Sequence, residues 1–256
     1  MSAHAGAESI EIERKYEVDD DAVMPSAEAF RKAGFAADEP VSFELAATYY
    51  DVPDRALAAA GIAVRQRTGG HDAGWHVKQR LQGGVREVAW PPAPEAPAAL
   101  YEKLRELFAE VARDGQGARR PLETQLEPLA EMRTTRTLTL LRVGEKPVIE
   151  LADDRVLGLE HTAGAYAASP HDNIVRRAWR EWEAELMPGA DPELLAAAEQ
   201  SLLAAGAVPS LSFAKIARAS GQLVAVAKRR GADPDQIAAL EALDASDQER
   251  ARRLEL

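Results

Sequence analysis

The N-terminal region alternates apolar and charged residues in the pattern of a β-strand. Residues 10–18 read IEIERKYEV, and in a strand Glu11, Glu13 and Lys15 lie on one face. Such alternation is also the ordinary pattern of an antiparallel sheet with one face in water. Neighbouring like charges repel each other, however, which makes the two glutamates a poor choice for a plain surface. A divalent cation would relieve that repulsion, because carboxylate oxygens are the ligands that Mg²⁺ or Mn²⁺ prefers.

A second acidic strand is predicted much later in the chain. Residues 173–186 place Glu181, Glu183 and Glu185 on one face, and the apolar set on the other face includes Trp182. Two strands with closely spaced glutamates are harder to explain by solvent exposure than one. The pair of acidic strands therefore favours a metal site built from carboxylates.

Two further segments carry cations at alternate positions, without a carboxylate beside each one. Arg65 and Arg67 share a face of the strand predicted at 62–68, and Lys78 lies in the strand predicted at 74–81. If the acidic and basic faces all point to one interior, that interior suits a metal-chelated polyphosphate. The metal would bridge carboxylates to phosphate oxygens, while arginines would hold the remaining oxygens through paired hydrogen bonds.

Glycine-rich turns predict how the strands connect. Gly69-Gly70 and Gly83-Gly84 fit tight hairpin turns, which make neighbouring strands antiparallel. The strands are predicted at 10–18, 43–51, 62–68, 74–81, 84–90, 125–143, 147–153, 155–160 and 173–186. A sheet of about eight strands tends to curl or close. The predicted fold class is α+β, with a closed eight-stranded antiparallel β-barrel that has a charged lumen.

Helices are predicted between the strands and, above all, after residue 190. Their predicted ranges are 25–34, 98–112, 191–205, 212–228, 234–243 and 246–254. The strand faces opposite the charges carry Ile, Tyr, Trp and Leu, which need something to pack on. We therefore expect helices packed outside the barrel and a helical C-terminal tail.

Composition narrows the range of functions. The chain has 256 residues, a formal net charge of -11 and no cysteine. The acidic balance argues against nonspecific nucleic-acid or membrane-surface binding. The absence of cysteine excludes disulfides and thiolate metal sites. With no signal-peptide pattern and no long apolar run, we expect a cytoplasmic protein, monomeric or homodimeric, with no nucleic-acid or membrane partner.

The charged segments also match the motifs of a known family. Glu11-Ile-Glu13-Arg-Lys15 resembles the ExExK motif of the CYTH superfamily, the triphosphate tunnel metalloenzymes. Further matches follow in the family's order: Thr48–Asp54, Val64–Arg67, Trp75–Lys78, Arg86-Glu87, Arg133–Arg136, Glu150–Asp154, Glu181–Glu185 and Pro209–Lys215. Phe213-Ala214 departs from the family pattern, in which a serine usually precedes the last lysine. The resemblance implies a CYTH-like tunnel domain over residues 9–220, followed by a helical extension over 221–256.

The resemblance also implies roles for individual residues. Metal ligands would be Glu11, Glu13, Glu183 and Glu185. Catalytic candidates, which would act on substrate or position water, are Lys15, Glu181 and Asp153. Substrate phosphates would be bound by Lys15, Arg65, Arg67, Lys78, Arg136 and Lys215. Arg14 and Arg86 have the opposite strand parity and are expected at the surface, whereas the directions of Arg133 and Glu87 stay open.

The activity that this resemblance implies is metal-dependent hydrolysis of inorganic triphosphate or a related triphosphate, with Mg²⁺ or Mn²⁺ as cofactor. Three alternatives stay open: a class IV-type adenylate cyclase, a thiamine triphosphatase, and a non-catalytic polyphosphate or nucleotide sensor. The first two need a pocket for an organic group, and no motif for one is visible. A sensor would not need both acidic motifs, and both are complete here.

Overall fold

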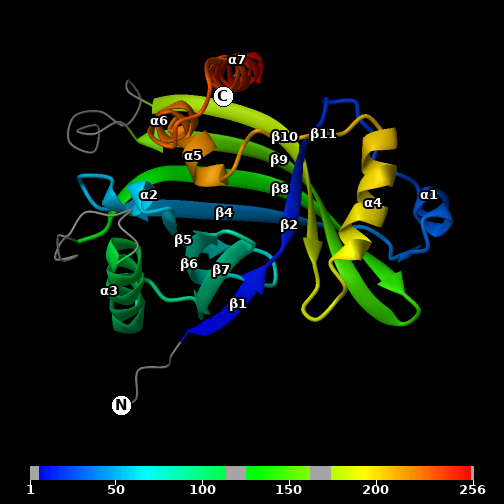
Figure 1. Ribbon diagram of the computed structural model, residues 1–256, viewed down its shortest axis with the longest axis horizontal. Helices are drawn as coiled ribbons and strands as arrows, with labels where there is room; N and C mark the ends of the chain where they lie inside the picture. The colour runs from blue at the N-terminus through cyan, green and yellow to red at the C-terminus, as the bar shows by residue number, and fades with distance from the viewer. Residues whose placement is uncertain (1–5, 114–124, 162–173, 255–256) are drawn as a thin grey trace.

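The computed structural model describes residues 6–113, 125–161 and 174–254. Eleven strands form one antiparallel sheet. The strands are β1 (Ala7–Glu11), β2 (Glu13–Glu17), β3 (Ala36–Ala37), β4 (Val41–Asp51), β5 (Ile62–Thr68), β6 (Gly74–Leu81), β7 (Gly84–Trp90), β8 (Glu127–Val143), β9 (Lys146–His161), β10 (Ile174–Leu186) and β11 (Val208–Pro209). Figure 1 shows β4, β8, β9 and β10 as long curved strands lying side by side. The prediction of an antiparallel α+β fold is confirmed.

The prediction of a closed eight-stranded barrel is wrong. The sheet has eleven strands in the order β1-β7-β6-β5-β4-β8-β9-β10-β2-β11, with β3 beside β8, and its two ends do not pair. The reason is a break at Ile12 within the predicted first strand. Before the break, β1 pairs with β7, and after it, β2 pairs with β10. Residues 7–17 therefore supply a strand near each end of the open strand order: β1 is the first strand, and β2 is the last but one.

The strand β9 corrects a second prediction. Residues 147–160 were expected as two strands separated near Asp153-Asp154, yet β9 runs unbroken from Lys146 to His161. Acidic pairs favour turns because their side chains compete for backbone hydrogen bonds. Here both carboxylates have arginine partners instead, Arg180 for Asp153 and Arg136 for Asp154. The chain therefore stays extended, and both neighbouring strands pair with it on either side of Asp153 and Asp154.

Helices cover the outer faces of the sheet. They are α1 (Ala27–Lys32), α2 (Ala56–Ala59), α3 (Ala98–Arg113), α4 (Glu193–Ala204), α5 (Lys215–Ala219), α6 (Leu223–Arg229) and α7 (Pro234–Arg253). The helix predicted at 212–228 is divided into α5 and α6. The two helices predicted at 234–243 and 246–254 form the single helix α7, which Asp233 caps by accepting a hydrogen bond from the backbone of Gln236.

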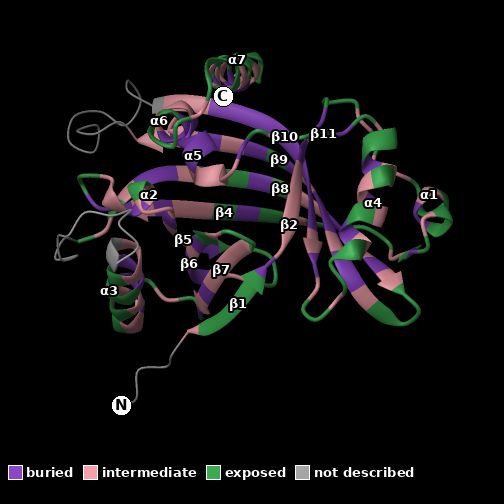
Figure 2. Ribbon diagram, in the orientation of Figure 1, coloured by how far each residue is buried: buried purple, intermediate pink, exposed green. Residues whose placement is uncertain are grey.

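Separate apolar clusters hold these helices against the sheet. At one end, Leu195 and Leu202 of α4 pack with Tyr16 and Trp182, whose side chains point outward from β2 and β10. At the other end, Leu100, Leu104 and Leu107 of α3 pack against Trp75 and Trp90 of the hairpin strands. Figure 2 shows the consequence, with buried strands beneath helices whose outer faces are exposed. Apolar residues thus occupy the outer strand faces at these two ends, while the inner face carries charged groups together with an apolar cluster around Tyr49, Met132 and Trp179 that packs against Ala219 of α5.

In the part of the chain that the structure describes, no helix is both long and apolar enough to cross a membrane.

Adjacent leucines in α4 test this packing. Leu202 is fully buried in the cluster around Trp182, whereas Leu203 is 37% exposed. We expect Leu202→Ala to lower the free energy of unfolding by about 2–5 kcal/mol, through lost burial and the cavity left behind. The matched control Leu203→Ala should cost about 1 kcal/mol or less. Urea unfolding followed by circular dichroism measures both, and equal losses would contradict the assignment.

Candidate functional site

The inner face of the sheet surrounds a cavity of about 360 Å³. Residues from β2, β4, β5, β6, β7, β8, β9 and β10 line it, and α5 closes part of it. Gly158 of β9 allows α5 to lie close to the sheet, since a Cβ at that position would sit 3.0 Å from the Cβ of Ala219. Each lining strand contributes alternate residues, so the strand parity deduced from the sequence decides which charges enter the cavity.

One row of carboxylates crosses three strands. Glu13 on β2 is the register partner of Glu185 on β10, which is in turn the partner of Glu150 on β9. Direct partners have side chains about 5 Å apart, so these three acidic groups lie close together. Burial raises the pKa of Glu185 to about 7; Lys78 opposes this effect, while Glu13, Glu150 and Glu183 add to it.

A second acidic cluster lies two residues further along the strands. Asp154, Glu181 and Glu183 each offer an oxygen within 4.8 Å of the others, and all three residues are buried. Both side-chain oxygens of Glu181 lack a hydrogen bond, although the Nζ of Lys215 lies 3.0 Å from one of them. Burial raises the pKa of Glu181, and Lys215 opposes that shift.

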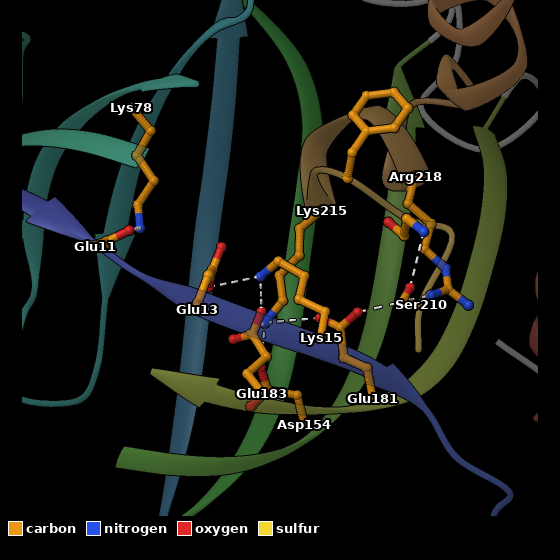
Figure 3. A network of polar contacts seen from close by, with 12 residues as sticks. Glu11, Glu13, Lys15, Lys78, Asp154, Glu181, Glu183, Ser210, Lys215 and Arg218 are labelled. Atoms are coloured by element: carbon orange, nitrogen blue, oxygen red, sulfur yellow. Dashed lines mark hydrogen bonds and ion pairs between the residues drawn. The ribbon is translucent and has the colours of Figure 1, made fainter. Parts of the chain in front are cut away.

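Three cations compensate this cluster. Arg136 donates to both oxygens of Asp154, at 2.8 and 2.6 Å, and to Glu183 at 2.8 Å. Lys15 and Lys215 also bind Glu183, Lys15 through a short contact and Lys215 at 3.1 Å (Figure 3). Burial alone would raise the pKa of Glu183, but the three cations outweigh it and hold that pKa well below its usual range.

The opposite wall of the cavity is basic. Lys78 donates to Glu11 at 2.6 Å and lies 3.3 Å from Glu87, and Arg65 lies 3.4 Å from the same Glu87 carboxylate. Burial lowers the pKa of Arg67 to about 9, and the neighbouring Arg65 guanidinium adds to that shift. Burial raises the pKa of Glu11 to about 8, against the effect of Lys78. Cations therefore crowd together on this side.

Most predicted site residues lie together around this cavity. Those lining it are Glu13, Lys15, Arg65, Arg67, Lys78, Arg136, Glu183, Glu185 and Lys215. Glu11 adjoins them through Lys78, and Glu181 through Lys215. Glu87, whose direction the sequence left open, lines the cavity, whereas Arg133 is exposed. Arg14 and Arg86 lie off the cavity and pair with Glu199 and Glu110.

Asp153 is the predicted residue that the structure places elsewhere. Its carboxylate points away from the cavity and accepts hydrogen bonds from Arg180 at 2.8 and 2.6 Å. Asp154 occupies the inner position instead. The signal was present in the sequence, because in an unbroken strand Asp154 lies on the same face as Glu150. The turn predicted between Asp153 and Asp154 would interrupt the alternation of the strand. For that reason the sequence did not indicate that Asp154 and Glu150 both point inward.

The donor set suits a hard divalent cation. The side chain of Glu185 forms no hydrogen bond or ion pair with another described residue, and both oxygens of Glu181 lack hydrogen bonds. Buried carboxylates that accept no hydrogen bond carry a desolvation cost, which the ion pair with Lys215 offsets only in part for Glu181. A cation with oxygen ligands, such as Mg²⁺ or Mn²⁺, would offset it. One set that could hold it is Asp154, Glu181 and Glu183, whose oxygens lie within 4.8 Å of one another, and beside it lies the row of Glu13, Glu150 and Glu185.

The basic wall suits an anion, because it too contains buried polar atoms that lack hydrogen bonds. The Nε atoms of Arg65 and Arg67 are buried without a hydrogen-bond partner. Burying guanidinium N–H groups in this way is costly, and phosphate oxygens would satisfy them through strong charge-assisted hydrogen bonds. The cavity thus combines cation ligands on one side with anion ligands on the other.

Comparisons with solved structures give only distant likenesses. A Bacillus halodurans protein described as a candidate adenylate cyclase is 17% identical with a TM-score of 0.46, over 82% of this chain and 97% of that chain. A candidate adenylyl cyclase from Hippeastrum, described as having a dominant triphosphatase activity, is 16% identical with a TM-score of 0.40, over 89% and 98%.

Sequence comparisons are more informative. The uncharacterized protein Rv2226 of Mycobacterium tuberculosis strain H37Rv and the uncharacterized protein MT2285 of strain CDC 1551 are each 32% identical over 229 residues. The match covers 86% of this chain and 42% of either relative, so the chain spans less than half of their length. The CYTH domain model matches residues 9–220. That match covers most of the chain, with its acidic strands and basic wall, and this protein belongs to the CYTH domain family.

Proposed function

We propose that this protein hydrolyses inorganic triphosphate, or a related triphosphate compound, in a reaction that depends on Mg²⁺ or Mn²⁺. The observation that carries the proposal is the division of the cavity into carboxylates on one side and cations on the other. Family members are triphosphate-related enzymes, which supports the substrate class. In this assignment the domain at 9–220 contains the site, and the extension at 221–256 packs on it.

Substrate binding falls to the cations of the cavity. Arg65, Arg67 and Lys78 on the basic wall are placed to bind phosphate oxygens, and Arg136 and Lys215 face them from the acidic cluster. Arginine can hold two oxygens of one phosphate at once, which fixes orientation as well as position. Burial disfavours the charged form of Arg136, but Asp154 outweighs this effect and raises its pKa well above the usual value. Arg136 therefore stays charged throughout.

Three groups are assigned to the chemical step. Lys15 lies between Glu13 and Glu183, which overcome its burial and hold its pKa well above the usual range. Lys15 can therefore donate hydrogen bonds to a phosphoryl group as charge develops on it. Glu181, whose oxygens accept no hydrogen bond and lie beside Lys215, is assigned to orient an attacking water, and Asp154 takes the position first predicted for Asp153. A divalent cation, when bound, would neutralise phosphate charge and lower the pKa of a water.

Phosphate release tests the proposal directly. We expect inorganic triphosphate to be cleaved with Mg²⁺ or Mn²⁺, and EDTA to abolish cleavage. The double variant Glu11→Gln/Glu13→Gln removes two acidic groups beside the substrate, so kcat/KM should fall by about two orders of magnitude. ATP and thiamine triphosphate in the same assay rank the substrates. Binding of triphosphate without release from any of them would refute the hydrolase.

The correction from Asp153 to Asp154 gives a matched pair of variants. Asp154→Asn weakens the hold on Arg136 inside the cavity, so kcat/KM for triphosphate should fall by about tenfold or more. Asp153→Asn affects the salt bridge with Arg180 on the outer face, so it should lower the melting temperature and leave kcat/KM within about twofold. Steady-state kinetics and thermal melts decide between them. The reverse pattern would restore Asp153 to the site.

Metal binding can be measured without turnover. Because a cation binds the folded protein, Mn²⁺ at about 100 times its Kd should stabilise the fold by about 2.7 kcal/mol, seen as a higher melting temperature. Glu185→Gln removes a central ligand and should abolish most of this shift. Glu145→Gln, at an exposed position in the turn between β8 and β9, is the control and should keep it. An unchanged shift in Glu185→Gln would rule out Glu185 as a ligand.

A further inference from the structure

The C-terminal helix α7 is fastened to the sheet by two arginines. Asp244 and Asp247 are three positions apart and so lie on one face of α7. Arg177 donates to Asp244 at 2.5 Å, and Arg218 donates to both oxygens of Asp247, at 2.6 and 2.9 Å. The family match ends at residue 220, so both carboxylates come from the extension.

Arg177 and Arg218 differ in the other residues that they contact. Arg177 makes its other contacts with Glu160, at 2.8 Å, and with the carbonyl oxygen of Ala219, at 3.3 Å. Neither of these residues lines the cavity. The Arg177–Asp244 pair therefore holds α7 in place without reaching the acidic cluster.

Arg218, by contrast, connects α7 to the candidate site. It donates to Glu17 at 2.8 and 3.0 Å. Its Nη1 also lies 3.8 Å from an oxygen of Glu181 (Figure 3). Only 2% of Arg218 and 3% of Asp247 is exposed. A guanidinium at this depth takes its position from its carboxylate partners, and Asp247 and Glu17 each accept a pair of hydrogen bonds from it. One buried chain of contacts thus runs from α7 to Glu181.

The same arginine also fixes the helix that bears Lys215. Lys215 and Arg218 are three positions apart in α5, which has only five residues. A helix this short has little stability of its own, so tertiary contacts must set its position. Lys215 reaches the acidic cluster, while Arg218 faces α7. Movement of Arg218 would therefore move Lys215 as well.

We propose that Asp247, in the extension beyond the family domain, is a positioning residue for the site. Through Arg218 it holds Glu181 in orientation and keeps Lys215 against the acidic cluster. Without the Asp247 carboxylate, the Arg218 guanidinium would turn further toward Glu17 and Glu181, compete for the oxygens of Glu181, and loosen α5. This inference rests on the proposed function only in taking the acidic cluster as the place where metal and triphosphate bind.

The experiment compares Asp247→Asn with the matched control Asp244→Asn. Both variants neutralise one carboxylate on the same face of α7, and each carboxylate pairs with a buried arginine. Thermal melts report the cost to docking of α7. Calorimetry with Mn²⁺ and inorganic triphosphate gives binding constants, and phosphate release gives kcat and KM separately. All measurements use the full chain at a temperature where both variants are folded.

We expect Asp247→Asn to weaken binding of Mn²⁺ with triphosphate by about 10–100-fold, the usual effect of losing a group that orients ligands. We expect kcat to fall with it, and Asp244→Asn to stay within about twofold of the wild type in both. If the two variants lose affinity equally, or if neither loses any, Asp247 has no positioning role. A loss confined to the melting temperature would likewise overturn the inference.

A double variant covers the case in which Asp247→Asn does not fold. Arg218→Met/Asp247→Leu replaces the buried pair with apolar groups, which is often tolerated; Glu17 loses its arginine partner but keeps the hydrogen bond from Ser210 and is 26% exposed. We expect this variant to fold and still to bind triphosphate at least tenfold more weakly than Asp244→Asn. If the wild type binds neither Mn²⁺ nor triphosphate, the proposed function itself fails. If it binds both and the double variant equals the control, only the role of Asp247 fails.

Discussion

Charge compensation inside the sheet is the constraint on which the rest of this structure depends. Glu183 is fastened by Lys15, Lys215 and Arg136, and those three cations arrive from β2, α5 and β8. Each of these ions loses most of its hydration on burial, at a cost of several kcal/mol that only close partners can offset. The strands must therefore meet in one register for the network to exist. A shift of one residue in β10 would turn Glu183 outward and Trp182 inward.

The outer surface follows from the same constraint. Since much of the inner face carries ions, the large apolar clusters around Trp182 and around Trp75 lie on the outer face and need helices above them. Trp182 and Glu183 are neighbours in sequence, and the first is buried under α4 while the second enters the ion network. Apolar burial outside thus provides the free energy that keeps charges together inside. Helices in this fold are structural supports for a polar interior.

Strand parity made much of the site predictable from the sequence. Alternation placed Glu13, Lys15, Arg65 and Glu183 on inner faces, and all four line the cavity. Strand parity predicts the wrong side-chain direction where the sequence suggests a turn inside a continuous strand. Asp153 and Asp154 suggested a turn, because the sequence does not reveal that distant arginines hold both side chains in a continuous strand.

Other features lay beyond any local pattern. The break at Ile12 leaves no mark in the alternation of residues 10–18, because it depends on which strands pair on each side. The split between α5 and α6 has a local cause by contrast, since Gly221 between them adopts a φ of +61°. Local sequence defines faces, hairpins and this helix end, whereas the pairing at the ends of the sheet and the course of the extension depend on distant partners.

The break at Ile12 has a consequence for how the protein is made. Lys15 and Glu183 are in contact across 168 positions of sequence, and β2 pairs directly with β10. A ribosome exposes Glu13 and Lys15 early, but their partners on β10 emerge only after most of the chain has been synthesised. Until then β2 has no edge to join. Folding of this domain must therefore wait for its C-terminal third, and contacts of such long range predict a slow final step.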